Sequence, residues 1–197
     1  DLKKQIALAI NPDKPAFDTL VNINDESEVY SYFVPIDENL PTCGPRAVFE
    51  FDEATGTLTI HGSRYIDDII NYYGGGSKTS PFFDIKHQVK HVVIADTINE
   101  IGKYAFCQFS NLESVALPNF EGLVISNAAF EKCRNLRTIY INGNEPIEGT
   151  ADLSQVSEIR AWAFSEDTCF ANIILPENDA EIAKTAFDSN VNLANVY

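Results

Sequence analysis

The sequence predicts an α/β repeat solenoid, in which short units stack and share one hydrophobic core. The motif Ile-x-x-x-Ala-Phe occurs four times in the second half of the chain, and apolar residues follow each copy at fixed distances. A stretch of alternating apolar and polar residues precedes the copies, as the strands of a β-hairpin would. Self-similarity with a period of roughly 20 to 50 residues is the signature of stacked repeats, because one such unit cannot bury its own apolar face.

The four motif copies define the period. Their phenylalanines step by 24, 34 and 23 residues, which fits a period near 23 with one insertion of about ten residues that we place at 142–152. We expect each motif to form a turn or short helix on one wall of the stack. Ala lets that wall approach its neighbour closely, and Phe fills the space between units. The copies occupy residues 101–106, 125–130, 159–164 and 182–187.

A second apolar set predicts one short strand per repeat, because its members at offsets nine and eleven from each Phe alternate with period two. Two amphipathic helices are the alternative, and the Pro and Gly between repeats disfavour it. We therefore expect a right-handed stack with parallel strands along one wall. The members at offsets six, nine and eleven are Leu112, Leu136, Phe170 and Leu193; Val115, Ile139, Ile173 and Val196; and Leu117, Ile141 and Leu175, with a half repeat at Val89, Val92 and Ile94.

The stretches 101–106 (IGKYAF) and 111–118 (NLESVALP) closely resemble the BspA-type leucine-rich repeat. That class is common in surface and secreted proteins of anaerobic bacteria and occurs in some protists. The resemblance extends upstream to 43–45 and 49–62, which look like the hairpin that often precedes such repeats. It implies a leucine-rich-repeat stack, a buried cysteine at Cys133, and a role in adhesion or protein contact. The sequence departs from the pattern at Ser126, Trp162 and Asn142, which affects local turns.

Residues 47–60 predict a β-hairpin on their own pattern, with the turn at 52–56. We expect it to cap the end of the core, which would otherwise expose apolar surface and unpaired strand edges. Residues 71–81 are a loop by composition. In residues 1–42, a helix at 2–10 and strands at 17–23 and 29–36 are interrupted by prolines. We expect 1–42 to be an N-terminal extension, 43–88 the hairpin cap with its connecting loop, and 89–197 the leucine-rich repeats.

Composition limits the classes of partner. The chain has 197 residues, with 14 Lys and Arg against 29 Asp and Glu, for a net charge of −15. Such a surface repels duplex phosphate, so we expect no nucleic-acid partner. The hydrophobic content of 45% can fill a core, and no apolar run reaches the roughly 18 residues that a membrane span needs.

The chain contains no Met, so we expect a processed or trimmed product. A removed signal peptide, or a lipoprotein leader with a lipid anchor upstream, would account for this. We expect an extracellular, cell-surface or periplasmic location. Four cysteines are too few for a disulfide-built scaffold of this length.

Motifs for chemistry are weak. Residues 74–79 (GGGSKT) lack the spacing of a phosphate loop and favour a plain loop. His87 and His91 lie on a segment that we expect to be extended, which would separate them, and His61 is remote. The acidic loops at 25–28, 52–53 and 177–181 lack the Asp/Asn alternation and Gly of a calcium loop. We expect no metal and no cofactor.

Cys107, Cys133 and Cys169 follow their phenylalanines by one, three and five residues. They should therefore occupy different places on successive repeats and form neither a ligand set nor a disulfide. A catalytic nucleophile is disfavoured, and Cys133 should pack as a small hydrophobe.

The outward face of the predicted strands is the candidate ligand-binding surface. Its ten positions contain no carboxylate in a chain that is otherwise strongly acidic. Such a strip suits contact with a protein or a glycan, and Tyr140 is the side chain that we expect at its centre. The alternatives are an inert strip, or one that residues 1–42 cover. The candidate site residues are His91, Val93, Ser114, Thr138, Tyr140, Asn172 and Ile174, and the other three positions are Ala116, Asn195 and Tyr197.

These observations favour a noncatalytic cell-surface or secreted module that mediates protein or adhesion contacts. A structural spacer domain of an envelope protein, with no ligand of its own, is the alternative. A hydrolase is a third hypothesis, and nothing in the sequence brings two carboxylates together for it.

Overall fold

The computed structural model describes residue 37 and residues 39–66, 80–167, 169–177 and 179–197. These residues belong to one compact unit, residues 34–197. The helix expected at 2–10, the strands expected at 17–23 and 29–36, the acidic loop at 25–28 and residues 71–79 of the expected loop lie outside the described residues.

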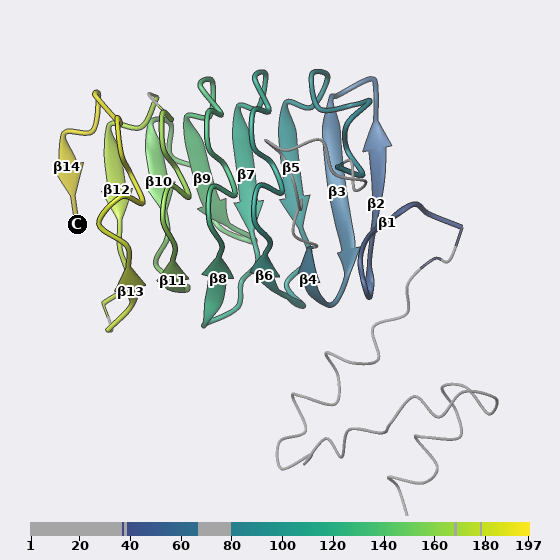
Figure 1. The fold of residues 1–197 in the computed structure, drawn as a ribbon, viewed down its shortest axis with the longest axis horizontal. Coiled ribbons are helices and arrows are strands. Elements are labelled where there is room, and N and C mark those ends of the chain that lie inside the picture. The colour runs from purple at the N-terminus through teal and green to yellow at the C-terminus, as the bar shows by residue number, and fades with distance from the viewer. Residues whose placement is uncertain (1–36, 38, 67–79, 168, 178) are drawn as a thin grey trace, which may run out of the picture. The chain divides into compact units, whose positions relative to one another are not determined.

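Nine strands form the larger sheet, and they follow one another in chain order (Figure 1). From β3 onward, neighbouring strands run parallel. The strands expected from the alternating apolar residues are therefore confirmed as members of one parallel array. The strands are β1 (Thr42–Gly44), β2 (Ala47–Asp52), β3 (Thr57–Gly62), β5 (His91–Ile94), β7 (Ser114–Leu117), β9 (Thr138–Ile141), β10 (Thr150–Asp152), β12 (Asn172–Ile174) and β14 (Asn195–Val196).

The hairpin predicted at 47–60 consists of β2 and β3, which pair antiparallel from Ala47↔Gly62 to Asp52↔Thr57. Its turn needs a left-handed residue, and Gly56 supplies it with φ of 71°. A Cβ at Gly56 would lie 3.0 Å from the Gln88 carbonyl oxygen, so this glycine also lets the hairpin approach the next segment.

A second sheet of five parallel strands faces the larger one, and the expectation of strands on a single wall missed it. Its strands are short and carry few buried apolar residues, such as Ile98 and Ile101 in β6. A run of this length is too brief to display an alternating pattern. The strands are β4 (Arg64–Ile66), β6 (Ile98–Ile101), β8 (Leu123–Ile125), β11 (Val156–Ile159) and β13 (Glu181–Ile182).

The motif segments are turns, and the described residues contain no helix, so the helical part of the predicted α/β class is wrong for them. The Phe106 N–H donates to the Ala129 carbonyl of the next repeat at 2.8 Å, and the Phe130 N–H donates to the Ala163 carbonyl at 2.8 Å. A helix would require each N–H to donate four residues back along its own chain. Every second N–H group of these turns instead donates to a backbone carbonyl of the next repeat.

The backbone conformation of these turns repeats with the motif. Residues two before and two after the motif Phe have positive φ, a left-handed conformation that costs L-residues about 1 kcal/mol or more. Its recurrence shows that bonding between repeats imposes it. The residues are Tyr104 (59°), Ala128 (54°) and Trp162 (59°) before the Phe, and Gln108 (61°), Lys132 (65°), Glu166 (61°) and Ser189 (62°) after it.

The insertion placed at 142–152 adds a strand to the larger sheet. Its last residues form β10, which lies between β9 and β12 with Ala151 opposite Ile139 and Ile173. Asn142 begins the insertion where a proline ends the strand of the preceding repeat. Pro118 has no N–H to offer the Ile94 carbonyl, and the Asn142 Nδ2 donates to that carbonyl at 2.7 Å instead.

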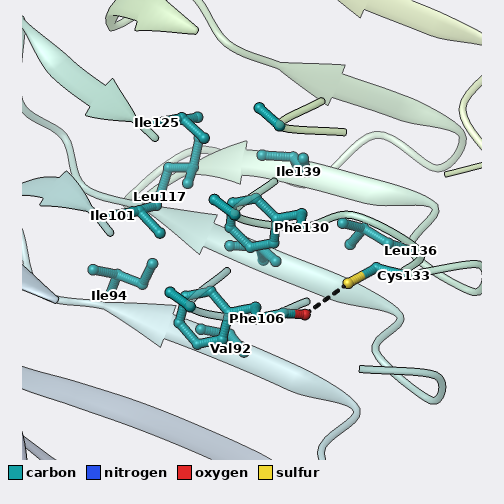
Figure 2. Close-up of a cluster of buried hydrophobic side chains, with 14 of the residues drawn as sticks. Val92, Ile94, Ile101, Phe106, Leu117, Ile125, Phe130, Cys133, Leu136 and Ile139 are labelled. Carbon is teal, nitrogen blue, oxygen red and sulfur yellow. Dashed lines mark hydrogen bonds between the residues drawn. The ribbon is translucent and has the colours of Figure 1, made fainter. Parts of the chain in front are cut away.

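Stacked phenylalanine rings run through the core between the two sheets. Figure 2 shows Phe106 and Phe130, whose ring centroids lie 5.3 Å apart with an interplanar angle of 15°. Phe164 continues the stack at 5.3 Å and Phe187 at 5.4 Å. Phe82 extends it in the other direction, 5.5 Å from Phe106. The expected half repeat omitted Phe82 because its following apolar residues, Val92 and Ile94, lie one position later than in the full repeats.

Candidate interaction face

The candidate site residues lie on four strands of the larger sheet and point away from the core. The register joins them into two rows across the strands, with His91 opposite Ser114, Ser114 opposite Thr138, and Ala116 opposite Tyr140. Their inward neighbours Val92, Val115, Ile139 and Ile173 are buried. The structure therefore brings all seven residues to one face, as the alternating pattern predicts.

The first row carries side-chain hydrogen bonds from strand to strand. His91 Nδ1 and Ser114 Oγ lie 2.8 Å apart. Asn195 Nδ2 donates to Asn172 Oδ1 at 2.8 Å, and Asn172 Nδ2 lies 3.4 Å from Thr150 Oγ1. These polar groups partly satisfy one another, so this row offers few groups to a ligand.

The second row carries the larger side chains, Val93, Tyr140 and Ile174, all half-buried. The added strand β10 places Asp152 between Tyr140 and Ile174. The ten expected positions lack a carboxylate, yet β10 brings one between them. Sequence reasoning missed Asp152 because it treated 142–152 as an insertion outside the repeat rather than as a strand.

The face is not evenly accessible. Thr138 and Ala116 are only 4% and 2% exposed although both point outward. Glu148 of the insertion contributes to this covering, with its Oε2 3.4 Å from Thr138 Oγ1 and its Oε1 3.7 Å from the Arg137 guanidinium. The insertion connects the end of β9 to the start of β10. Its residues 143–148 are exposed and lie outside the core.

The histidines are engaged separately. His61 Nε2 lies 2.9 Å from Glu50 Oε1 in the hairpin, and His87 Nδ1 lies 3.4 Å from Ser110 Oγ. Within the described ranges, no group of three or more His, Cys, Asp and Glu side chains is arranged to hold a metal ion. In the acidic segment at 52–53, Asp52 accepts bonds from Thr55 Oγ1 and the Ala54 N–H, which lower its pKa.

The cysteine thiols have three different environments. Cys133 is fully buried in the core, as expected, and its Sγ donates to the Phe106 carbonyl at 3.1 Å (Figure 2). Burial raises the pKa of this thiol well above its ordinary value. Cys169 is exposed and donates to the Arg134 carbonyl at 3.0 Å, and Cys107 Sγ lies 3.9 Å from Glu131 Oε2. A thiolate nucleophile is disfavoured at Cys133.

Cation–carboxylate contacts elsewhere join repeats. Arg160 bonds both carboxylate oxygens of Glu158, at 2.8 and 3.0 Å, and these bonds lower the pKa of Glu158. The same guanidinium reaches Glu100 at 3.2 Å, two repeats away. The Arg134 guanidinium likewise lowers the pKa of Glu166. Sequence reasoning missed these contacts because the partners are up to 60 residues apart.

With this geometry established, the family match is decisive. A model of the BspA type leucine rich repeat region matches residues 79–197 in six copies. The chain belongs to this BspA-type family. Leucine-rich repeats are generally protein-interaction modules. The match begins before residue 89, where we expected the repeats to start, and it includes the stacked Phe82.

Solved structures of other leucine-rich repeat proteins share this fold. A protein from Eubacterium ventriosum is 18% identical with a TM-score of 0.56, and the similarity covers 78% of this chain and 42% of that chain. A leucine-rich repeat protein from T. pallidum is 17% identical with a TM-score of 0.50, covering 75% of this chain and 66% of that chain. At these identities the likeness shows the fold alone. The BspA-type chain thus spans less than half of the first relative. No curated protein matches the chain.

The part of the chain that the structure describes contains no helix long and apolar enough to cross a membrane. The strands and turns described above account for that part of the chain.

Proposed function

We propose that the chain is a noncatalytic binding module that contacts a protein partner through the outward face of its larger sheet. The observation that carries this proposal is the second row of that face, where the amphipathic ring of Tyr140 stands half-buried between Ala116 and Asp152. Aromatic residues in such settings supply much of the energy of protein interfaces. A glycan partner is the second candidate for the same row.

The surroundings of Tyr140 support a protein partner. The insertion next to it carries Ile147, which is 60% exposed. Arg137 is shared between Glu113 at 3.2 Å and Glu148 at 3.7 Å, which gives the row a charged rim. Aromatic and apolar side chains bordered by polar groups are usual in protein interfaces.

The wider architecture of the proposal follows the sequence analysis. We take the repeats as a short right-handed solenoid, since parallel strand crossovers are right-handed in about 98% of cases. The β2–β3 hairpin caps its first end, and the chain is organised as the extension 1–42, the cap and loop 43–88, and the repeats 89–197. Membership in the BspA-type family supports an exported protein at the cell surface or in the periplasm that acts in adhesion.

Tyr140→Ala tests the binding face. Immobilised wild type and variant are exposed in parallel to surface-protein extracts, and the affinity of each captured protein is then measured with purified components. We expect Tyr140→Ala to weaken binding at least about tenfold, as truncation of an interface hot spot does. Trp162→Ala, which removes an exposed aromatic side chain from the turn wall, is the control and should bind as wild type does.

Equal binding of wild type and Tyr140→Ala to every captured protein would remove the face assignment. Failure to capture any protein or glycan would instead favour the spacer role.

A further inference from the structure

The third residue after each motif phenylalanine occupies one column of the stack and packs against the preceding repeat; Phe109, Cys133 and Asp167 are buried, and Asn190 is half-buried. In this column, Cys133 Sγ donates to the Phe106 carbonyl at 3.1 Å, and Asn190 Nδ2 donates to the Phe164 carbonyl at 2.7 Å. Two side chains of different chemistry thus make the same bond, in each case to the motif phenylalanine of the repeat before. The column consists of Phe109, Cys133, Asp167 and Asn190.

Asp167 stands between these two donors and has a carboxyl group in their place. Its side chain is 0% exposed. Oδ1 accepts the Cys133 N–H at 2.7 Å, whereas Oδ2 is buried and has no hydrogen-bond partner among the described residues. The equivalent acceptor for this repeat is the Phe130 carbonyl, which already accepts the Cys133 N–H at 3.1 Å and has a second lone pair.

An ionised carboxylate cannot donate, so a charged Asp167 could not make the bond that Cys133 and Asn190 make. Its Oδ2 would lie buried without a donor, whereas both neighbours in the column give a hydrogen to a carbonyl. A neutral carboxylic acid has the O–H that this position requires. The buried oxygen without a partner and the donors at the equivalent positions of the two neighbouring repeats therefore favour the neutral acid.

We propose that Asp167 is a pH-sensitive latch within the stack: its carboxyl is neutral in the folded protein, the carboxyl O–H donates to the Phe130 carbonyl, and loss of the proton weakens the joint between the two repeats. The proton comes from solvent at acidic pH and returns to solvent on ionisation, and no other bond is made or broken. This device is independent of the proposed binding function, since it lies in the core rather than on the outward face.

The groups that face the carboxyl agree with this arrangement. Burial is the main cause that raises the pKa of Asp167 well above its ordinary value, and Glu131 and Glu166 add to it, against the opposing bond from the Cys133 N–H. In the preceding repeat, the Lys132 ammonium lies 2.8 Å from the Glu131 carboxylate, and the Arg134 guanidinium lies 2.6 Å from the Glu166 carboxylate.

From the following repeat, the column contributes the uncharged Asn190, and Asp188 lies beyond it on the surface. The thiol of Cys133 is neutral, since burial also raises its pKa.

The direction of the pH effect follows from linkage. A carboxyl whose folded pKa exceeds its unfolded value stabilises the fold fully below about pH 4, and this contribution is lost as pH rises toward the folded pKa. Across that interval the folding equilibrium constant falls about tenfold per pH unit relative to a variant that cannot ionise. Paired carboxylates such as Glu158 and Glu166 act in the opposite direction, so the comparison with the variant isolates the latch.

Urea unfolding of the full 197-residue chain as a function of pH tests the latch. Asp167→Asn keeps the shape and supplies a permanent N–H donor, as Asn190 does one repeat later. We expect the ratio of wild-type to Asp167→Asn folding constants to fall as pH rises through the interval, so the variant gains relative stability toward neutral pH. Asp188→Asn, which neutralises an exposed carboxyl in the next repeat, should keep the wild-type pH profile.

A carbon-13 titration of the wild-type Asp167 carboxyl provides a second readout that does not depend on whether the variant folds. The proposal expects this carboxyl to stay protonated above the ordinary Asp range. A carboxyl that ionises within the ordinary range, or a ratio of folding constants that does not change with pH, would overturn the latch.

Discussion

Single residues at equivalent positions of the repeat hold neighbouring repeats together. Phe130 is the clearest case, because its ring stacks at 5.3 Å on both Phe106 and Phe164. Phe130 is 0% exposed, and the carbonyl groups of its two stacking partners, Phe106 and Phe164, accept side-chain hydrogen bonds from the next repeat. Packing and polar bonding therefore converge on the same residue of each repeat.

Phe130→Ala should lower the free energy of unfolding by about 3 to 5 kcal/mol, because removal of a buried ring leaves a cavity between two stacked rings. Chemical denaturation of the variant measures this loss. Phe83→Ala, at a phenylalanine that is 56% exposed, is the matched control and should change the midpoint little. A midpoint that Phe130→Ala leaves unchanged would contradict the assigned repeat register.

The sequence could predict the position of Phe130 but not the state of Asp167. The Phe spacing is visible as a repeated motif, and burial follows from it. Asp167 becomes meaningful only when the column of Phe109, Cys133, Asp167 and Asn190 is aligned through the structure, since these four residues share no chemistry that a pattern search would group.

At the scale of elements, the strands of the larger sheet follow from local alternation, whereas the turns do not. An Ile four residues before Ala and five before Phe suits one face of a helical turn as well as it suits the observed turn. What separates the two is the destination of alternate N–H groups, which bond the next repeat about 23 residues along the chain. A local pattern carries no information on that destination. The second sheet was missed for a related reason, because its strands are too short to alternate.

Gln108→Gly tests the left-handed positions of these turns. Gln108 has φ of 61°, a conformation that glycine adopts without a steric cost, so we expect the substitution to raise the free energy of unfolding by about 0.5 to 1 kcal/mol. The same substitution at exposed Gln88, which is not among the positive-φ residues, should instead destabilise the fold slightly through the added backbone freedom. Thermal unfolding of the two variants beside wild type decides the sign, and a loss of stability at Gln108 would contradict the strain assigned to it.

At the scale of the whole described unit, the repeat register sets which side chains can meet. Cys107, Cys133 and Cys169 lie at three different offsets from their phenylalanines, and their sulfur atoms bond a carboxylate, the Phe106 carbonyl and the Arg134 carbonyl. A disulfide would require two of them to share a column on neighbouring repeats.

We therefore expect mass measurement after alkylation without reductant to show these three residues as alkylated thiols. The same measurement after reduction gives the reference mass. A bridge between any two of the three would contradict the register of the stack, while leaving the family assignment in place.

The strand β10 limits how a partner could bind along successive strands of the larger sheet. Each repeat offers one strand, so a partner moving along β5, β7 and β9 meets a new pair of outward side chains every roughly 4.8 Å, one pair per repeat. β10 then adds the pair Thr150 and Asp152 before the next repeat contributes its strand, β12. The smaller sheet has no such extra strand, and β8 there pairs directly with β11. Because of this extra strand, the larger sheet is displaced by one strand relative to the smaller sheet from this point onward. A ligand whose own groups recur at the repeat spacing would fit the strands on either side of β10. Only a ligand with an extra interval at the matching place could bind across it.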